Sequence, residues 1–399
     1  MTKSPRIFFI ANGVFSEHIA GGDIHFLEMA RALVRKGYEV HFLGGFVLEK
    51  VIASWQLSVS FHPTEEKMEA GLSDRSFFSQ IVLFWNYTRR CLKAFQILNK
   101  KTKQDDVVYA VSDYWFDVLP TVRSHASYKV GVWHMEAPSF EEILFRKRAD
   151  VPFSRLPSFH NWLSQKLSLK WLSQCVHKKI FYLHPDMREK LLALGCQCGE
   201  ISLISYGVDV ATPQKIGEVE KEYDVIWLGR LHRQKGVDDI IPTLNYLAER
   251  VDNFKAVIVG KVKEGLQPMI GKPLANQVFF PGFVSEEEKF RLLKASRVFV
   301  MPSRHEGSPR VIGEALLCGT RVVAYDVKTY FEMFHDWIYY VPKFDLFTFQ
   351  KEVENQVIQS RNQTKLINSF DLEQFKNENS WEATGEHFVK EIQKLLVKN

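Results

Sequence analysis

Short apolar runs rich in β-branched residues alternate with stretches of helical periodicity along the whole chain. In the first half these runs predict strands at residues 6–11, 39–43, 107–110, 129–133 and 179–182. A second series is predicted at 224–228, 255–259, 277–280, 298–301 and 321–324. The segment 23–36 between the first two strands has an apolar face at helical spacing. This alternation of strand and helix is typical of parallel α/β sheets.

A polar segment without periodicity, residues 211–222, separates the two series and is the predicted linker. We therefore predict two doubly wound, Rossmann-like α/β domains at residues 1–210 and 222–370. The tail 380–398 places Phe388, Ile392 and Leu395 on one face of a predicted helix, so residues 371–399 are expected to form a separate helical segment.

The segment from Glu306 to Glu314 carries most of the functional information. It follows a predicted buried strand, Ser308 suits a helix N-cap, Pro309 suits the first helical position, and Gly319 suits the stop. A helix N-terminus at the carboxyl end of a parallel strand favours an anion. Carboxylates beside it would repel a phosphate but can accept hydrogen bonds from sugar hydroxyls. The combination predicts a ligand that is part phosphate and part sugar.

This segment, with Pro302-Ser303 before it and the Cys-Gly-x-x-Val-Val run from Cys318 after it, resembles the E-x7-E signature of retaining family 4 glycosyltransferases. The resemblance implies the GT-B fold, in which two Rossmann-like domains face each other across a cleft. It implies that the last helix packs back on the N-terminal domain. It also implies transfer of a hexose from a nucleotide-diphosphate sugar to a glycan or lipid-linked acceptor, with retention, in polysaccharide or glycolipid biosynthesis.

Gly229, Arg230 and Lys235 follow the first strand of the second domain in a Gly-Arg-Leu-x-x-x-Lys-Gly arrangement. Glycine permits close backbone approach, and two cations would stand at the carboxyl edge of the sheet. The resemblance implies that Arg230 and Lys235 hold the donor diphosphate. Cations already in place stabilise the charge of a departing diphosphate most in the transition state. The structural alternative is an exposed basic turn.

The resemblance also assigns the two carboxylates. It implies that Glu314 accepts hydrogen bonds from the ribose hydroxyls and that Glu306 contacts hydroxyls of the transferred sugar. Backbone amides near Arg310 and Val311 would face the diphosphate. A solvated helix glutamate and a loop charge are the structural alternatives for these two residues.

Gly282 and Phe283 resemble a turn whose backbone contacts the nucleotide base, and a simple strand-to-helix turn explains them nearly as well. Gly260-Lys261 stands where relatives carry Gly-Asp-Gly. The sequence has no Asp-x-Asp pair in a loop context of the kind that holds a divalent ion on a diphosphate. We therefore expect a metal-independent reaction without any cofactor beyond the nucleotide sugar.

Gly21 and Gly22 follow the first strand and open a helix that carries His25. They resemble the family's Gly-Gly loop near the donor phosphate and the acceptor; a flexible turn is the alternative. His134 ends the strand 129–133, where relatives place a histidine near the transferred sugar, and a structural histidine is the alternative. Ser112-Asp113, at the end of another strand, is a lower-ranked neighbour.

Retention allows two mechanisms. A double displacement needs a carboxylate nucleophile at the anomeric carbon, and the sequence nominates none. In front-face attack the departing phosphate itself accepts the proton of the acceptor hydroxyl. That alternative suits a site made of Arg230, Lys235 and helix amides, and it is the mechanism we expect.

Charge is uneven although the net value is only +5. Residues 75–104 contain seven Lys or Arg and no acid, and residues 143–180 contain eight against Asp150 alone. Both segments are rich in Phe, Trp and Leu, so they suit an anionic bilayer or a lipid-pyrophosphate acceptor; aromatic core residues with a solvated basic rim are the alternative. Nucleic acid is not expected, since no stacking motif or recognition helix accompanies the charge.

The cysteine content and the absence of long apolar runs predict the cell compartment in which the protein works. Five scattered cysteines among 399 residues favour a reducing environment over a disulfide framework. We see no leader segment and no run of the roughly 20 apolar residues that a membrane-spanning helix needs. We therefore expect a cytoplasmic protein that acts at the inner face of the membrane.

Two rival functions remain open at this point. A sugar-nucleotide epimerase on the same two-domain fold would bind the same donor, but the E-x7-E segment speaks against it. A catalytically silent glycosyltransferase-like subunit would bind glycan or a partner enzyme and would have no need of functional nucleotide-binding residues.

Overall fold

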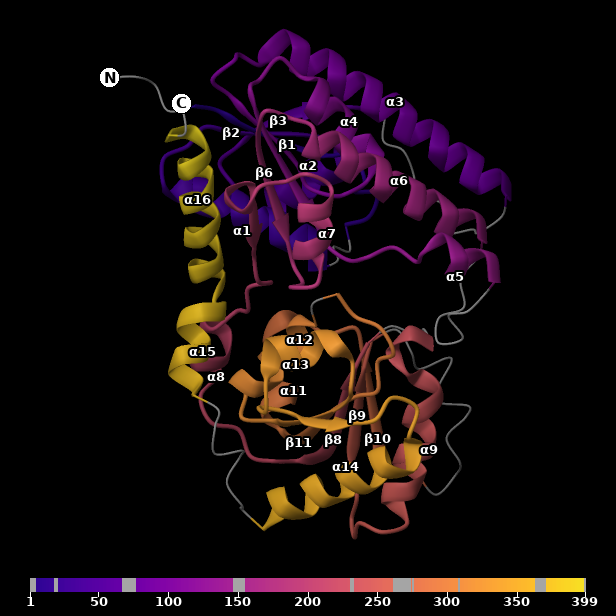
Figure 1. The fold of residues 1–399 in the computed structure, drawn as a ribbon. Coiled ribbons are helices and arrows are strands. Elements are labelled where there is room, and N and C mark those ends of the chain that lie inside the picture. Colours follow the sequence, from indigo (N-terminus) through magenta and orange to yellow (C-terminus); the bar gives the residue numbers. More distant parts are fainter. Residues whose placement is uncertain are drawn as a thin grey trace. The chain divides into compact units, whose positions relative to one another are not determined.

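The computed structural model describes residues 5–17, 21–66, 77–145, 155–229, 233–260, 274, 276–307, 309–362 and 371–397. These residues form two compact units. The first contains the described residues up to 145, residues 155–206 and those from Glu382 onward, and the second contains those of Gly207–Trp381. Each unit is built on its own parallel sheet (Figure 1).

In the first unit the described residues form a sheet of seven parallel strands in the order β3-β2-β1-β4-β5-β6-β7. Its elements are β1 (Ile7–Ala11), α1 (Gly21–Arg35), β2 (Val40–Gly44), α2 (Phe46–Ser54), β3 (Ser60–Pro63), α3 (Phe77–Lys101), β4 (Val107–Ala110), α4 (Trp115–Arg123), β5 (Tyr128–Trp133), α5 (Phe140–Phe145), α6 (Arg155–Ser173), β6 (His177–Tyr182), α7 (Met187–Ala193), η1 (Cys198–Glu200), β7 (Ile201–Leu203) and nearly all of α16 (Trp381–Val397).

Alternate residues of the central strands supply the two faces of this sheet. On one face, Phe8 and Ile10 of β1 form a buried cluster that includes Ala94 and Leu98 of α3. On the other face, Phe388 of α16 packs on the sheet, with ring centroids 5.5 Å from Tyr109 and 4.8 Å from Phe181. Helices therefore cover the sheet on both sides, which explains why β1 and β4 are buried along their whole length.

In the second unit the described residues form six parallel strands in the order β10-β9-β8-β11-β12-β13. Its elements are α8 (Ala211–Ile216), β8 (Tyr223–Leu228), η2 (Arg233–Lys235), α9 (Val237–Ala248), β9 (Ala256–Val259), β10 (Val278–Gly282), α11 (Glu286–Lys294), β11 (Ser296–Met301), α12 (Arg310–Leu317), β12 (Arg321–Tyr325), α13 (Lys328–Phe334), β13 (Tyr339–Val341), α14 (Leu346–Arg361) and α15 (Leu372–Asn379).

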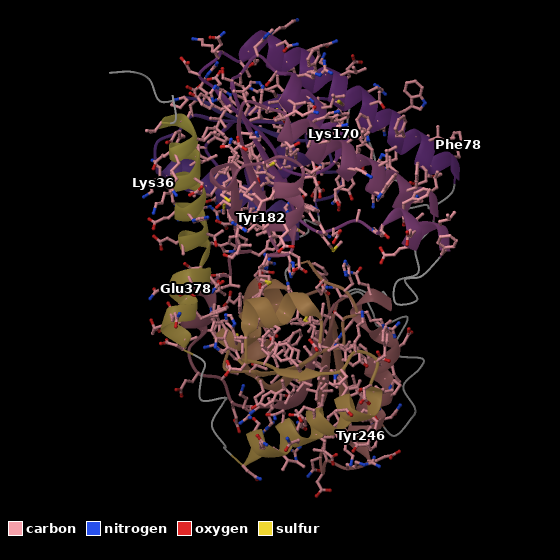
Figure 2. The ribbon with its side chains drawn as sticks, viewed as in Figure 1. Lys36, Phe78, Lys170, Tyr182, Tyr246 and Glu378 are labelled. Carbon is pink, nitrogen blue, oxygen red and sulfur yellow. The ribbon has the colours of Figure 1, made fainter. Side chains whose placement is uncertain are left out.

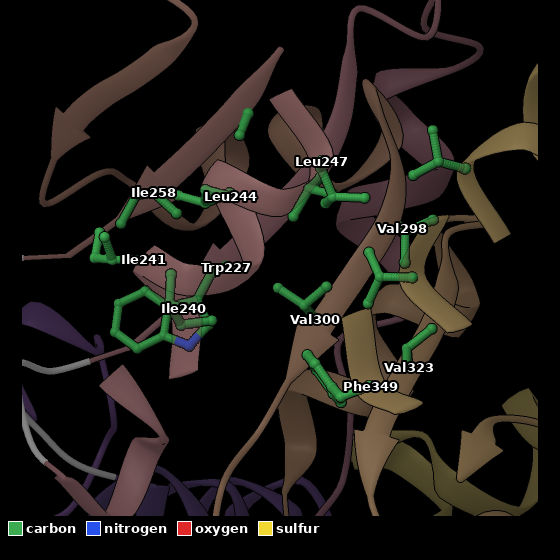
Figure 3. Packing of buried hydrophobic residues seen from close by; sticks show 14 of the residues in the cluster. Trp227, Ile240, Ile241, Leu244, Leu247, Ile258, Val298, Val300, Val323 and Phe349 are labelled. Carbon is green, nitrogen blue, oxygen red and sulfur yellow. The ribbon is translucent and has the colours of Figure 1, made fainter. Parts of the chain in front are cut away.

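Two buried clusters hold this second sheet. One joins the strands to α9 and α14, and Figure 3 shows part of it around Trp227 and Phe349. The other joins the opposite face to α11, α12, α13 and α15, with Phe290, Ile312 and Phe375 among its members. Burial of this kind contributes roughly 25 cal/mol per Å² of apolar surface, so the two clusters fix the strands whose ends carry the candidate site.

Both sheets have a point at which the strand order reverses. It lies between β1 and β4 in the first sheet and between β8 and β11 in the second. In open parallel sheets ligands bind beyond the carboxyl ends of the strands at such a point, because the loops on the two sides diverge there. The doubly wound architecture that the sequence predicts is confirmed.

All ten predicted strands are present, with ends within two residues of those expected. Three short strands were missed, β3, β7 and β13, and each lies at the edge of a sheet. The predicted linker is wrong in part, because residues 211–216 form α8, whose Pro213 is buried. The end of the chain also differs from the expectation of one segment: α15 belongs to the second unit and nearly all of α16 to the first.

Candidate functional site

The loop after β8 begins at Gly229, which lies against the indole ring of Trp227. A Cβ atom at Gly229 would stand 2.8 Å from a ring carbon of Trp227, closer than real Cβ contacts allow. Trp227 is itself 2% exposed and packs in the cluster beneath the loop. Only glycine therefore fits here without displacing a core side chain. Arg230, the next predicted residue, lies outside the described residues.

Lys235 and Glu306 form an ion pair that joins the loop after β8 to the loop after β11. Lys235 Nζ lies 2.6 Å from Glu306 Oε1, and both side chains are mostly buried. The same two loops are joined by the Gln234 amide, which donates to the carbonyl of His305 at 2.8 Å. The sequence predicted both charges at this edge of the sheet, and the structure brings them together at the point where the strand order reverses.

Gly236 makes this close approach of the two loops possible. Its φ of +68° lies in the left-handed region, and a Cβ atom would stand 2.0 Å from the carbonyl oxygen of Pro302. Gly236 is also the N-cap of α9. Any side chain here would meet backbone, which cannot move aside like a flexible side chain. Glycine therefore permits the close packing of the two loops that carry Lys235 and Glu306.

Glu314 lies on α12, is 2% exposed and contacts two cations. Lys289 Nζ of α11 is 2.9 Å from Glu314 Oε2, and Arg310 Nε, one turn earlier on α12, is 3.0 Å from Oε1. Burial alone would raise the pKa of Glu314, but the charges of Lys289 and Arg310 bring that pKa below its ordinary value. Glu314 is therefore an ionised carboxylate, one turn into α12, that can accept hydrogen bonds.

Helix α12 begins one residue later than expected. Pro309 stands at the N-cap, with Arg310 as the first helical residue, whereas the sequence suggested Pro309 for that position. Ser308, the expected N-cap, lies outside the described residues. The first amides of an α-helix have no acceptor within the helix. The amides of Arg310 and Val311 therefore stand at the positive end of the helix dipole, beside the buried Glu314.

Glycine residues at the ends of β8, β9 and β10 join these neighbouring strands by backbone hydrogen bonds. The amide of Gly229 donates to the carbonyl of Val259 at 3.1 Å, and the amide of Gly260 donates to Gly282 at 2.8 Å. Gly260 has φ +127°, and its Cβ would stand 2.1 Å from the Gly229 carbonyl. Gly282 has φ +79° and is followed by Phe283, whose side chain is 71% exposed. Gly260 thus has a structural task, and Phe283 presents a ring at the same edge.

In the first unit, Gly21 and Gly22 are the first residues of α1. A Cβ atom at Gly22 would meet the ring of His134 at 3.7 Å and the hydroxyl of Tyr206 at 3.9 Å, ordinary contact distances. The structure therefore brings the predicted Gly22 and His134 together. It adds Tyr206, which sequence reasoning missed because no strand or motif marks it.

Both ring nitrogens of His134 are already hydrogen-bonded. Nε2 lies 3.0 Å from the carbonyl oxygen of Val111, so Nε2 carries the proton, because a carbonyl can only accept. Nδ1 then accepts from the hydroxyl of Tyr206 at 2.8 Å. Burial lowers the pKa of His134, so the ring is neutral at pH 7 and held in one tautomer. To donate a hydrogen bond to a sugar, His134 would have to give up the bond to Val111.

His25 stands behind this pair on α1 and is fully buried. Its ring centroid lies 6.0 Å from that of His134 and 5.3 Å from that of Tyr206. Burial, with a smaller contribution from His134, lowers the pKa of His25 to about 3. A charged His25 is therefore strongly disfavoured in the folded protein.

Two buried carboxylates follow β4. Burial raises the pKa of Asp113 to about 6 although the Gln165 amide donates to it at 2.7 Å. Burial also raises the pKa of Asp117 to about 7, although Asp117 accepts from the Ser112 hydroxyl at 2.5 Å and from the backbone N–H of Asn12 at 2.8 Å. Ser112 and Asp113 were low-ranked candidates for the site in the sequence, and Asp117, which lies on α4, was not predicted.

Residues 210–365 match the family model described as Glycosyl transferases group 1, and this match lies within the second unit. An uncharacterized glycosyltransferase of Methanocaldococcus jannaschii is 33% identical over 135 residues, which are 31% of this chain and 33% of that relative's length. Mannosylfructose-phosphate synthase of Agrobacterium fabrum is 23% identical over 377 residues, 80% of this chain and 76% of that protein.

Among solved structures, that of Anabaena HepE in complex with UDP-glucose has a TM-score of 0.67 at 15% identity and covers 98% of this chain and 99% of that one. The fold is therefore the GT-B fold of glycosyltransferases. None of the helices in the described part of the chain is both long and apolar enough to cross a membrane.

Proposed function

We propose that this protein is a retaining glycosyltransferase of family 4 that moves a hexose from a nucleotide-diphosphate sugar to a hydroxyl group of a glycan or lipid-linked acceptor. The observation that carries the proposal is the grouping of Lys235, Glu306, Glu314 and the N-terminus of α12 where the strand order of the second sheet reverses. The match of residues 210–365 to the group 1 model supports it, as does the UDP-glucose bound to HepE.

The donor would be held by charge and by hydrogen bonds. The diphosphate would lie at the amides of Arg310 and Val311, with the ammonium group of Lys235 near its oxygens. The ionised Glu314 would accept from the ribose hydroxyls and Glu306 from the transferred sugar. Gly282 and Phe283 would border the base, and Arg230 would add a second cation to the diphosphate.

In the proposed step, the bond between the anomeric carbon and the β-phosphate oxygen breaks, and its electron pair stays on the diphosphate. Lys235 and the α12 amides stabilise that growing charge. The acceptor oxygen bonds to the same face of the carbon and passes its proton to the departing phosphate oxygen. No protein nucleophile is required, and the fixed cations replace a divalent ion, so the reaction is proposed to be metal-independent.

Groups of the first unit would serve the acceptor side. Gly21 and Gly22 place the start of α1 beside the ring of His134. The hydrogen bonds of His134 to Val111 and Tyr206 hold its imidazole ring in one orientation. We propose that this fixed, neutral ring contacts the transferred sugar.

The experiment is a thermal-unfolding series with UDP, GDP, ADP and dTDP in the presence of EDTA. A ligand at about 100 times its dissociation constant stabilises a protein by roughly 2.7 kcal/mol, so one nucleotide should raise the melting temperature measurably. The same series with Glu314→Gln, compared with that variant's own baseline, should show a much smaller shift. The sugar nucleotide with that base is then offered for transfer, and NMR of the product gives the anomeric configuration.

Absence of a shift with every nucleotide would contradict the transferase and favour a catalytically silent subunit. A shift that appears only when a divalent metal is added would contradict metal independence. An inverted anomer in the product would leave the transferase in place and exclude retention.

A further inference from the structure

We propose that the outer faces of α3 and α6 form a surface that binds an anionic lipid bilayer. We call it the α3–α6 surface and define its apolar part by Phe78, Ile81 and Trp85 of α3 with Leu156, Phe159 and Leu163 of α6. Membrane binding by this surface does not depend on the proposed transfer reaction.

The apolar side chains of α3 are exposed although the helix packs on the sheet. Phe78 is 74% exposed, Trp85 62% and Ile81 39%, and they follow each other at helical spacing on one face. The opposite face, with Ala94 and Leu98, is buried in the core. Figure 2 shows Phe78 at the end of α3, pointing away from the unit. These residues therefore do not belong to the core, which was the alternative left open by the sequence.

Helix α6 repeats the arrangement. Leu156, Phe159 and Leu163 are exposed at spacings of three and four residues, whereas Leu169 and Leu172 are buried. The two helices meet through Phe84 of α3, whose ring centroid lies 6.3 Å from that of His160 on α6. Both helices also pack on α4, and their apolar halves approach each other at this ring contact.

Exposed cations follow the exposed apolar residues of both helices, toward the C-terminal half of each helix. Arg89 and Lys93 are exposed on α3, and Lys166 and Lys170 are exposed on α6. Neither the 25 residues of α3 nor the 19 residues of α6 include an acid. In Figure 2, Phe78 marks the apolar end of this surface and Lys170 lies toward its basic end. Not every cation of the segment contributes, because Arg90 is buried in an ion pair with Glu65.

This pattern fits an anionic membrane better than other occupants. Aromatic and aliphatic side chains beside Lys and Arg are the composition of helices that lie in the membrane interface, and each cation near anionic lipid adds attraction. A second copy in a symmetric dimer would offer these cations the same surface, on which neither α3 nor α6 carries an acid to pair with them. A nucleic acid would engage the cations but would give Phe78 and Trp85 no apolar environment.

The surface is linked to the end of the first sheet. On α6, the Ser164 hydroxyl accepts from the Trp115 amide at 2.8 Å, and the Gln165 amide donates to the Met135 carbonyl at 2.8 Å. Trp115 begins α4, which follows β4, and Met135 follows β5. A bilayer bound by α6 would thus lie beside the loops that the proposed function, if correct, uses for its acceptor.

The test is sedimentation of the full chain with vesicles at low salt, without donor or acceptor. One set of vesicles is made of phosphatidylcholine alone, and the other also contains about 40 mol% of the anionic lipid phosphatidylglycerol. We expect the chain to sediment with the anionic vesicles and to be released by salt. The variant Lys93→Glu/Lys166→Glu should bind at least about 25-fold more weakly, because each cation near an anionic surface contributes a factor of about five.

The variant Phe78→Ser/Trp85→Ser should also lose binding, whereas Phe347→Ser/Lys351→Glu on α14 should bind as the unchanged chain does. Phe347 and Lys351 are exposed on the second unit, so they match the changed residues in type. The proposal is overturned if the unchanged chain stays in solution, or if the α3 and α6 variants bind as well as the α14 control. Binding to DNA but not to vesicles overturns it too, as does a vesicle-free dimer that these variants abolish.

Discussion

Lys289 and Glu314 form an ion pair between α11 and α12, with Lys289 Nζ 2.9 Å from Glu314 Oε2. The same ammonium group lies 2.7 Å from Glu286, one turn earlier on α11. The two carboxylates differ in exposure, because the side chain of Glu314 is 3% exposed and that of Glu286 is 65% exposed. One lysine therefore has a buried partner and a solvated partner, and the chain offers a matched pair of substitutions.

We expect Glu314→Gln to lower the free energy of unfolding by about 3 kcal/mol, because it leaves Lys289 and Arg310 around a buried neutral amide. Glu286→Gln should change it by no more than about 0.5 kcal/mol, since an exposed ion pair contributes little. Denaturant unfolding of both variants without nucleotide measures the difference. Equal losses in the two variants would contradict the assignment of Glu314 as the buried partner.

The contribution of Glu314 to the free energy of unfolding should decrease as the pH falls into the acid range. The pKa of Glu314 in the folded protein lies below the ordinary value of about 4.3. The stabilisation is then fully present above about pH 4.3 and is lost as pH falls through the lower folded pKa. The stability difference between the unchanged protein and Glu314→Gln should be constant from about pH 8 to 5 and shrink below about pH 4. A difference that shrinks already near neutral pH would show a raised pKa instead.

The sequence predicted the central strands well because they are apolar along their whole length. The strand at Ile7–Ala11 is entirely buried, and a run of five apolar residues is visible without any structure. The strand at Ser60–Pro63 is half exposed and reads as Ser-Phe-His-Pro, so neither its periodicity nor its composition marks it. Edge strands such as this one depend on pairing with a neighbour, and pairing is a tertiary property.

The candidate site was predictable where one short segment carries it. Glu306 and Glu314 stand in a single run, and Lys235 follows a strand by a fixed number of residues. Lys289 could not be found, because its contact with Glu314 depends on how α11 packs against α12. Tyr206 was hidden for the same reason, since its bond to His134 joins residues that lie 72 positions apart.

The loop geometry around Gly236 predicts a contrast between two glycines with almost the same backbone. Gly236 and Gly319 have φ values of +68° and +66°. A Cβ at Gly236 would stand 2.0 Å from the Pro302 carbonyl, whereas nothing lies within 4 Å at Gly319. Gly319→Ala should therefore cost only the conformational penalty of about 1 kcal/mol. Gly236→Ala should cost more than about 3 kcal/mol, which thermal unfolding of the two variants would show; similar losses would contradict the close approach.

Removing the cation of Lys235, in the loop after β8, should weaken binding of the nucleotide. We expect Lys235→Met to raise the dissociation constant of the nucleoside diphosphate by about 10–100-fold, because a hydrogen bond between charged groups contributes about 1.5–3 kcal/mol. Lys351→Met on α14 is the control and should leave the constant unchanged. Calorimetric titration without metal measures both. Unchanged affinity in Lys235→Met would remove the lysine from the donor site and leave the fold assignment untouched.

His25 should make the folded protein sensitive to acid. Its pKa is about 3 in the folded protein and about 6.5 in the unfolded chain, so below about pH 6.5 the unfolded chain binds one more proton at this residue. Stability should fall by about 1.4 kcal/mol for each pH unit between about pH 6 and 4 from this group alone. His25→Leu removes that proton, so its free energy of unfolding should decline less steeply over this range by the same amount. The comparison uses the slope of the free energy of unfolding against pH, so a loss of packing at neutral pH does not affect it. Parallel slopes in the two proteins would show that His25 is accessible to protons in the folded state.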